Sequence, residues 1–400
     1  MGAPNFAAPQ GAAETLRRFQ GAPLWSRGFR PFFLSAGVWA IIAIALWLPI
    51  YTGDLRLSSA LNPIDWHAHE MIFGYIVAVV AGFLLTAIPN WTGRLPVSGA
   101  PLAGLAALWV AGRVATFFSA RIGEPLAAAI DVAFLLAFAA LIGREVWSGK
   151  SGRNLKVVAL VLLLAIANAG FHYEDALTGS AEYTQRAALS LMVMLILLIG
   201  GRVTPSFTHN WLARAGEAQR PTPFSRADAV MMGFSGLALT AWTLAPDAAW
   251  SGGLAIAAGL GNLWRLSRWR GWVVRRDALV LILHVGFGLA ATGFIFAGAH
   301  GLSPSFVPYD AGVHVWAIGG AGAMTLAMMT RATLGHAGRA LVANRATRFA
   351  YALVLAALAA RLALAFAPAH ATRWLHAAAC AWILAFVAFL IGYALLLVRR

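Results

Sequence analysis

The chain carries about twelve runs of roughly 20 apolar residues, each long enough to cross a bilayer as an α-helix. Short polar connections separate the runs along most of the 400 residues. With 60% hydrophobic and only 11% charged residues, this pattern excludes an ordinary soluble globule. We predict an all-α integral membrane protein with about twelve transmembrane helices. The predicted spans are 31–51, 66–89, 100–119, 124–147, 156–177, 186–204, 227–245, 249–267, 277–299, 310–332, 347–367 and 373–398.

The distribution of basic residues orients these spans. Of the 30 Lys and Arg residues, Arg113 and Arg361 lie inside spans, and most others lie near the termini or in every second connection. The remaining connections hold only a few basic residues: Arg56, Arg121, Arg186 and Arg373. The positive-inside rule then predicts that both termini are cytoplasmic and that the second span begins on the outer side.

The net charge of +15 has the same origin, because the basic residues form no patch with interleaved aromatic residues. The expected partner is therefore the lipid bilayer, and no nucleic acid is expected. Residues 1–25 are expected to form a mobile cytoplasmic segment without a removable signal peptide. Residues 26–400 are expected to form a single transmembrane domain. The single cysteine, Cys380, excludes a thiolate cluster within one chain.

Two histidines and a carboxylate stand at the outer start of the second span, in Trp66-His67-Ala68-His69-Glu70. Polar side chains inside a bilayer are costly and usually face a bundle interior or a ligand. Imidazole binds metals and haem iron, so we predict a metal or haem site here. Residues two apart on an α-helix point about 200° apart, so His67 and His69 are expected to have different neighbours. The alternative is that both only anchor the helix end.

Most other histidines fall near the same outer face. His172 lies near the end of the fifth span and His314 lies just inside the tenth, and we predict that both bind a metal or cofactor with His67 and His69. His284 is a deeper candidate for a cofactor, since it lies roughly 10 Å into the ninth span at 1.5 Å per residue. Solvated or interfacial roles are favoured for two histidines beside a short loop, His370 and His376.

The sequence also contains an internal repeat. A shift of 245 positions aligns His69 with His314 and Gly74 with Gly319. A shift of 120 brings in the sixth span, where the position that matches His69 is Leu189. A period of four helices predicts three quasi-repeats, an architecture that resembles the catalytic subunit of haem–copper oxidases. The adjacent His-His copper pair and the His-x-x-x-Tyr element of that family are absent, so the resemblance is distant and architectural.

Two arginines lie inside the predicted spans. Arg113 and Arg361 both fall in the outer halves of their helices. Because an intramembrane arginine needs a partner, and a haem propionate accepts two parallel hydrogen bonds, both are candidates for cofactor binding. The alternative partners of these arginines are Asp131, Glu124 or a backbone carbonyl.

Several strings together resemble the NnrS family of haem- and copper-containing bacterial membrane proteins. They are residues 27–33 (RGFRPFF), 66–70 (WHAHE), 82–93 (GFLLTAIPNWTG), 202–211 (RVTPSFTHNW) and 329–339 (MTRATLGHAGR). The resemblance covers nearly the whole chain. It implies a polytopic protein of the bacterial inner membrane that binds haem b and copper. It also implies a link to nitric oxide metabolism and to resistance against nitrosative stress.

Nitric oxide is the expected small ligand, because ferrous haem binds it and it dissolves in the bilayer. The electron donor is unknown. Two other functions stay open. One is a nitric oxide or quinol oxidoreductase, in which Glu70 would relay protons. The other is a proton-coupled secondary transporter, although the period of four helices differs from the repeats typical of such proteins.

Overall fold

The structure, a computed structural model, describes residues 19–399 apart from the side chain of residue 153. Most of the predicted N-terminal segment, residues 1–18, lies outside the described residues, as does residue 400. Across the described part of the chain the regular structure is helical, without strands. The predicted all-α class is therefore confirmed.

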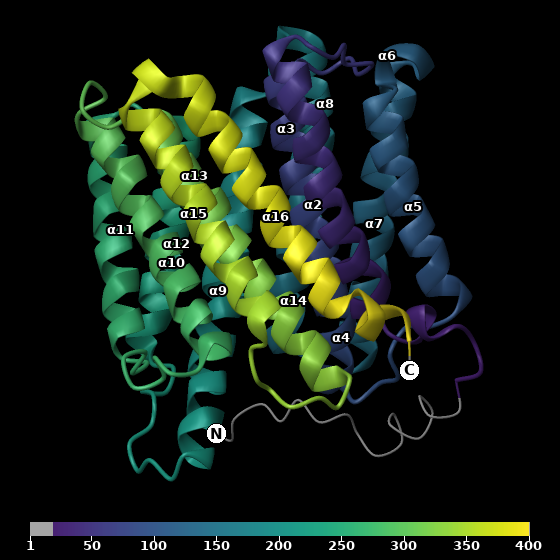
Figure 1. Cartoon of the computed structure of the whole chain (residues 1–400), viewed down its shortest axis with the longest axis vertical. Helices are drawn as coiled ribbons and strands as arrows, with labels where there is room; N and C mark the ends of the chain where they lie inside the picture. Colours follow the sequence, from purple (N-terminus) through teal and green to yellow (C-terminus); the bar gives the residue numbers. More distant parts are fainter. Residues whose placement is uncertain (1–18, 400) are drawn as a thin grey trace. The chain divides into compact units, whose positions relative to one another are not determined.

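Long helices stand at every predicted span (Figure 1). Their bounds are α2 Phe29–Thr52, α3 Pro63–His69, η2 Glu70–Ile76, α4 Val77–Thr92, α5 Ala100–Phe117, α7 Glu124–Ser148, α8 Leu155–Thr178, α9 Glu182–Arg214, α10 Arg226–Leu244, α11 Ala249–Ser267, α12 Ala278–Leu302, α13 Tyr309–His314, η4 Val315–Gly322, α14 Ala323–His336, α15 Arg345–Phe366 and α16 Ala371–Val398. Short helices connect some of them: η1 Pro23–Ser26, α6 Ser119–Ile122, η3 Gly152–Asn154 and η5 Pro368–His370. Among residues 19–399, 11 helices are long and apolar enough to cross a membrane, which supports a multi-pass membrane protein.

Helix α11 occupies a predicted span but is not among these 11 helices. Two of its polar side chains contact α10, with which it packs. Asn262 Nδ2 donates to Ser235 Oγ over 2.8 Å, and Arg265 Nε donates to Asp228 Oδ1 over 3.3 Å. The helix forms where the sequence predicts it. The polar residues that contact α10 lower its mean hydropathy below that of the other spans.

Close approach of two backbones fixes the packing of α11 on α12. A Cβ atom at Gly252 would lie 2.6 Å from the carbonyl oxygen of Gly298. Reciprocally, a Cβ atom at Gly298 would lie 2.4 Å from the carbonyl oxygen of Gly252. Small residues are enriched at such interfaces because apolar lipid provides no hydrophobic force to drive helices together, so close van der Waals packing must do so.

Packing divides the chain into two compact units. Unit 1 comprises Met1–Ala188, Ala332–Arg339 and Leu390–Arg400, and unit 2 comprises Leu189–Arg331 and Ala340–Phe389. Within unit 1, α7 packs against α4, α5 and α8, and α2 packs against α4 and η2. Within unit 2, α12 packs against α11, α13 and η4, and α15 packs against α13 and η4. The assignment of residues 26–400 to a single domain stays a prediction.

Two π-helical segments mark the internal repeat. The segment η2 begins directly after His69, and η4 begins directly after His314, so the shift of 245 reappears in the local backbone. Helix α9, which carries Leu189 at the corresponding position, has no π-helical segment. Since π-helical turns occur frequently at functional sites, the two repeats that carry the histidine are the stronger candidates for a site.

The contact between α11 and α12 generates a matched pair of variants. Gly252→Ala is expected to lower the thermal midpoint of the purified protein, because the new methyl group meets the backbone of α12 and overpacking costs about 1–3 kcal/mol. Gly253→Ala makes the same change one residue along, where a Cβ atom meets nothing within 4 Å. Equal midpoints for the two variants in the same detergent would contradict this account of the packing.

Candidate metal-binding site

Six buried polar side chains meet inside unit 1. They come from the α3–η2 helix, α5, α7 and α8: His69, Glu70, Arg113, Asp131, Asn168 and His172. Each is less than 5% exposed. Buried polar groups are costly unless they are hydrogen-bonded and their charges are paired, so the contacts among these six decide whether the arrangement is stable.

The start of α3 sets the direction of His69. Asn62 Oδ1 accepts hydrogen bonds from the backbone N–H groups of Ile64 and Asp65, both over 3.0 Å. Pro63 occupies the first helical turn, where its missing N–H group is no loss. This cap fixes where the helix begins and therefore which face carries each histidine.

His67 and His69 have different neighbours, as their spacing predicts. The ring of His67 stacks on Trp47 of α2, with ring centroids 4.2 Å apart and an interplanar angle of 27°. His69 is fully buried and takes part in the polar cluster. The prediction from helical periodicity is confirmed at this point.

Asp131 is the centre of the cluster. Its Oδ2 atom lies 3.1 Å from His69 Nε2 and 3.3 Å from His172 Nε2. The same oxygen accepts a hydrogen bond of 2.8 Å from Asn168 Nδ2. Its other oxygen, Oδ1, accepts a hydrogen bond from Arg113 Nη2. A single carboxylate thus connects α5, α8 and the α3–η2 helix to α7.

Arg113 bridges two carboxylates. Besides Asp131, it donates from Nη1 to Glu70 Oε2 over 2.7 Å. Glu70 Oε1 in turn lies 3.1 Å from His69 Nδ1. Of the partners that the sequence left open for Arg113, the structure shows Asp131, together with Glu70. One guanidinium against two carboxylates leaves the cluster with a formal charge of −1 when both imidazoles are neutral.

Two glycines make room for these charged side chains. A Cβ atom at Gly74, inside η2, would lie 2.9 Å from Glu70 Oε2 and 3.0 Å from Arg113 Nη1. A Cβ atom at Gly112 would lie 2.7 Å from Asp131 Oδ1. The π-helical segment and the adjoining helix α5 are therefore fitted to the Glu70–Arg113–Asp131 bridge.

Three of the six side chains have the chemistry of metal ligands. His69, Asp131 and His172 each offer one ligand atom, and these atoms lie within 4.8 Å of one another. Imidazole and carboxylate donors suit copper, zinc and iron. Metal-binding histidines almost always engage a second group through the other ring nitrogen, and Glu70 occupies that position at His69 Nδ1. The donor set fits a metal ion.

The remaining histidine candidates lie in unit 2. His314 Nδ1 is 2.8 Å from the backbone oxygen of Asp310. Arg361 Nη2 lies 3.8 Å from a carboxylate oxygen of the same residue, Asp310 Oδ2. His284 Nε2 is 2.8 Å from Thr208 Oγ1. A backbone carbonyl at one ring nitrogen is a common arrangement for a ligand histidine. At His314 this arrangement leaves Nε2 as the nitrogen that would bind a ligand.

The sequence pattern does not single out two members of the cluster. It offers Asp131 only as an alternative partner of the intramembrane arginines, and it gives Asn168 no role. A carboxylate within the apolar run 124–147 is itself a signal, because ionisable residues in spans usually mark function. Asn168 precedes His172 by one helical turn, a spacing that places both side chains on one face of α8.

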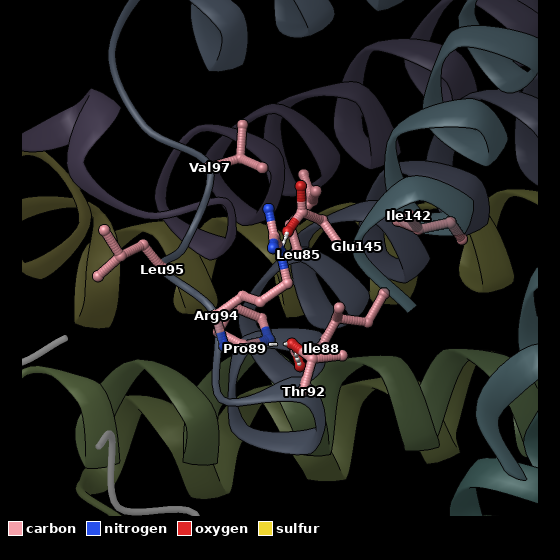
Figure 2. A pocket seen from close by; sticks show the side chains of 9 residues that line it. All are labelled: Leu85, Ile88, Pro89, Thr92, Arg94, Leu95, Val97, Ile142 and Glu145. Carbon is pink, nitrogen blue, oxygen red and sulfur yellow. Dashed lines mark hydrogen bonds and ion pairs between the residues drawn. The ribbon is translucent and has the colours of Figure 1, made fainter. Parts of the chain in front are cut away.

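A small pocket lies elsewhere in unit 1, where α4 and α7 approach each other near Arg94 (Figure 2). It is lined largely by apolar side chains, and Arg94 Nε is paired with Glu145 Oε2 over 2.5 Å. Its cavity volume of about 10 Å³ has room for about one water molecule and is far below the range of about 300–1,000 Å³ typical of small-molecule sites. None of the six cluster residues lines it.

Residues 23–400 match the family described as NnrS protein. The chain belongs to the NnrS family. No individually curated protein sequence matches it. Membership of the NnrS family agrees with the resemblance of the five sequence strings and supports a membrane protein connected with nitric oxide.

The bridge made by Arg113 generates a stability prediction. Arg113→Met is expected to destabilise the protein by about 3–5 kcal/mol, because it leaves two carboxylates buried without their cation. The measurement is unfolding of the purified protein in mixed micelles. Arg121→Met is the control, since Arg121 is exposed and lies outside the cluster. A loss of stability no greater than that of the control would contradict the assigned role.

Proposed function

We propose that this NnrS-family protein is an inner-membrane metalloprotein that binds copper through His69, Asp131 and His172. The observation that carries the proposal is the convergence of their three ligand atoms in a buried site. Glu70 would orient His69 from its other nitrogen. Arg113 would hold both carboxylates in position.

The charge of the cluster favours a bound cation. A formal charge of −1 in a low-dielectric interior requires a compensating positive charge. A copper ion would supply it and accepts imidazole ligands. A proton on His69 would supply the same positive charge without a metal. The two cases are therefore distinguished by the metal content of the purified protein and not by its stability.

Haem b is proposed for a separate centre. His314 is the residue that would bind the haem iron, because its Nδ1 atom already faces a backbone carbonyl and Arg361 lies on the helix packed against α13. His67, on the face of α3 opposite to His69, and the buried His284 are the other proposed cofactor ligands. When bound, haem iron and copper would supply redox-active metals that bind nitric oxide. We place the protein in the bacterial inner membrane, with both termini cytoplasmic.

Metal analysis of single variants tests the copper proposal. Protein purified from a copper-replete host is expected to lose its copper in His69→Ala and in His172→Ala, since each change removes one of three ligands. His376→Ala is the control, because His376 is exposed and its Nδ1 atom lies 2.7 Å from the backbone oxygen of Thr372. Copper-free wild type, or equal copper in all four proteins, would refute the site.

Optical spectra test the haem proposal separately. His314→Ala is expected to reduce the Soret absorbance of protein expressed in a haem-replete host, because the change removes the imidazole that would hold the haem iron. His376→Ala, an exposed histidine whose Nδ1 atom also lies beside a backbone oxygen, is expected to leave the spectrum unchanged. An unaltered spectrum of His314→Ala would exclude this ligand.

The same buried cluster favours one other function, a proton-coupled transporter. Chains of His, Asp and Glu inside a membrane carry protons in such proteins, and the His172–Asp131–His69–Glu70 contacts form such a chain. Proton uptake by proteoliposomes without bound metal would support the transporter. Abolition of that uptake by Asp131→Asn would assign it to the cluster.

A further inference from the structure

Three carboxylates outside the metal cluster stand on the same helices as the ligands. Asp65 precedes His69 by four residues on α3, and Asp175 follows His172 by three residues on α8. Glu124 precedes Asp131 by seven residues on α7. At 1.5 Å per residue these separations are about 6, 4.5 and 10 Å along the helix axes.

All three carboxylates are displaced toward one end of unit 1. Asn62 Nδ2 donates to the carbonyl oxygen of Gly179 over 3.3 Å, so α3 begins where α8 ends. The backbone N–H of Ala60 donates to Ser119 Oγ over 2.8 Å, which brings the segment before α3 close to the start of α7. Under the positive-inside expectation this end faces the outer side.

Burial differs among these carboxylates. Glu124 is partly exposed, whereas Asp65 and Asp175 are buried, as are the ligands His69 and His172. Asp175 experiences the charges of Asp65, Glu124 and His69, so the carboxylates lie close to one another and to the metal cluster. The group therefore extends from the partly exposed Glu124 toward the cluster.

Two of these carboxylates lack hydrogen bonds to some of their buried oxygen atoms. Asp175 Oδ1 and Glu124 Oε1 are buried oxygen atoms without a hydrogen-bond partner among the described residues. Asp175 experiences repulsion from both Asp65 and Glu124, and it is also hydrogen-bonded to Asp65. Asp65 Oδ2 accepts hydrogen bonds from Asn62 Nδ2 and from the backbone N–H of Ala181. Buried carboxylate oxygens that lack a donor are attractive positions for a cation.

We propose that Glu124, Asp175 and Asp65 form an access path that collects a metal cation at the outer end of unit 1 and delivers it to His69, Asp131 and His172. Carboxylates attract a cation and raise its local concentration. Imidazoles hold copper more strongly than carboxylates do, so transfer inward is favourable. The inference rests on the proposed function, since it requires the cluster to bind the ion.

The test separates the rate of loading from the extent of loading. Metal-free full-length protein in detergent is mixed with Cu(I) in ascorbate, and uptake is followed against a chromogenic Cu(I) chelator. Asp175→Asn is expected to slow uptake about tenfold, at the lower limit of electrostatic steering effects, and to reach the same final copper content. The rate for wild type is expected to fall with ionic strength more steeply than that of the variant.

Two further variants complete the experiment. Glu124→Gln removes the charge of the partly exposed carboxylate at the start of the path. It is expected to slow copper uptake without altering the final copper content. Glu182→Gln is the control, because Glu182 is a 70% exposed carboxylate paired with Arg186 over 3.9 Å, and it is expected to load at the rate of wild type. Equal rates in Asp175→Asn, Glu124→Gln and wild type would overturn the access path alone. Wild type that takes up no copper would overturn both the path and the proposed copper site.

Discussion

The bridge from Glu70 through Arg113 to Asp131 is the interaction on which the rest of unit 1 depends. It joins the α3–η2 helix, α5 and α7 by charge-assisted hydrogen bonds, which are the strong class of hydrogen bond. Without Arg113, two carboxylates would be buried with no fixed cation. With it, each carboxylate keeps one oxygen for a histidine: Glu70 Oε1 for His69 and Asp131 Oδ2 for His69 and His172.

The backbone is adapted to this bridge. Gly74 lies inside the π-helical segment η2, in contact distance of both Glu70 and Arg113, and Trp109 Nε1 donates to its carbonyl oxygen over 3.1 Å. A second π-helical segment follows His314 in unit 2, where Arg361 and Asp310 lie 3.8 Å apart. An intramembrane arginine, a carboxylate and a histidine at the mouth of a π-helical segment therefore recur in both units.

Hydrophobic periodicity predicted most of the fold, because each span must satisfy its backbone hydrogen bonds internally and therefore forms a helix. The opposed directions of His67 and His69 also followed from the sequence, since they depend only on helical geometry. The partner of Arg113 was left open because Asp131 and Glu70 reach it from other helices. Tertiary packing decides such contacts, and no local pattern encodes them.

Two acidic residues of the proposed access path, Asp65 and Asp175, could not be predicted from the sequence for a related reason. Asp65 and Asp175 each stand one turn from a histidine, but their significance appears only when α3 and α8 are placed side by side. The π-helical segments were equally hidden, because an α-helix and a π-helical turn share the same apolar composition. The repeat of 245 positions was the only sequence signal that pointed to them.

The central claim is that His69, Asp131 and His172 together bind copper, and the ligand environment of the bound metal tests it most directly. X-ray absorption spectroscopy of the copper-loaded wild type is expected to show two imidazoles and at least one oxygen ligand. Sulfur scattering from methionine or Cys380, or a single imidazole, would contradict the account.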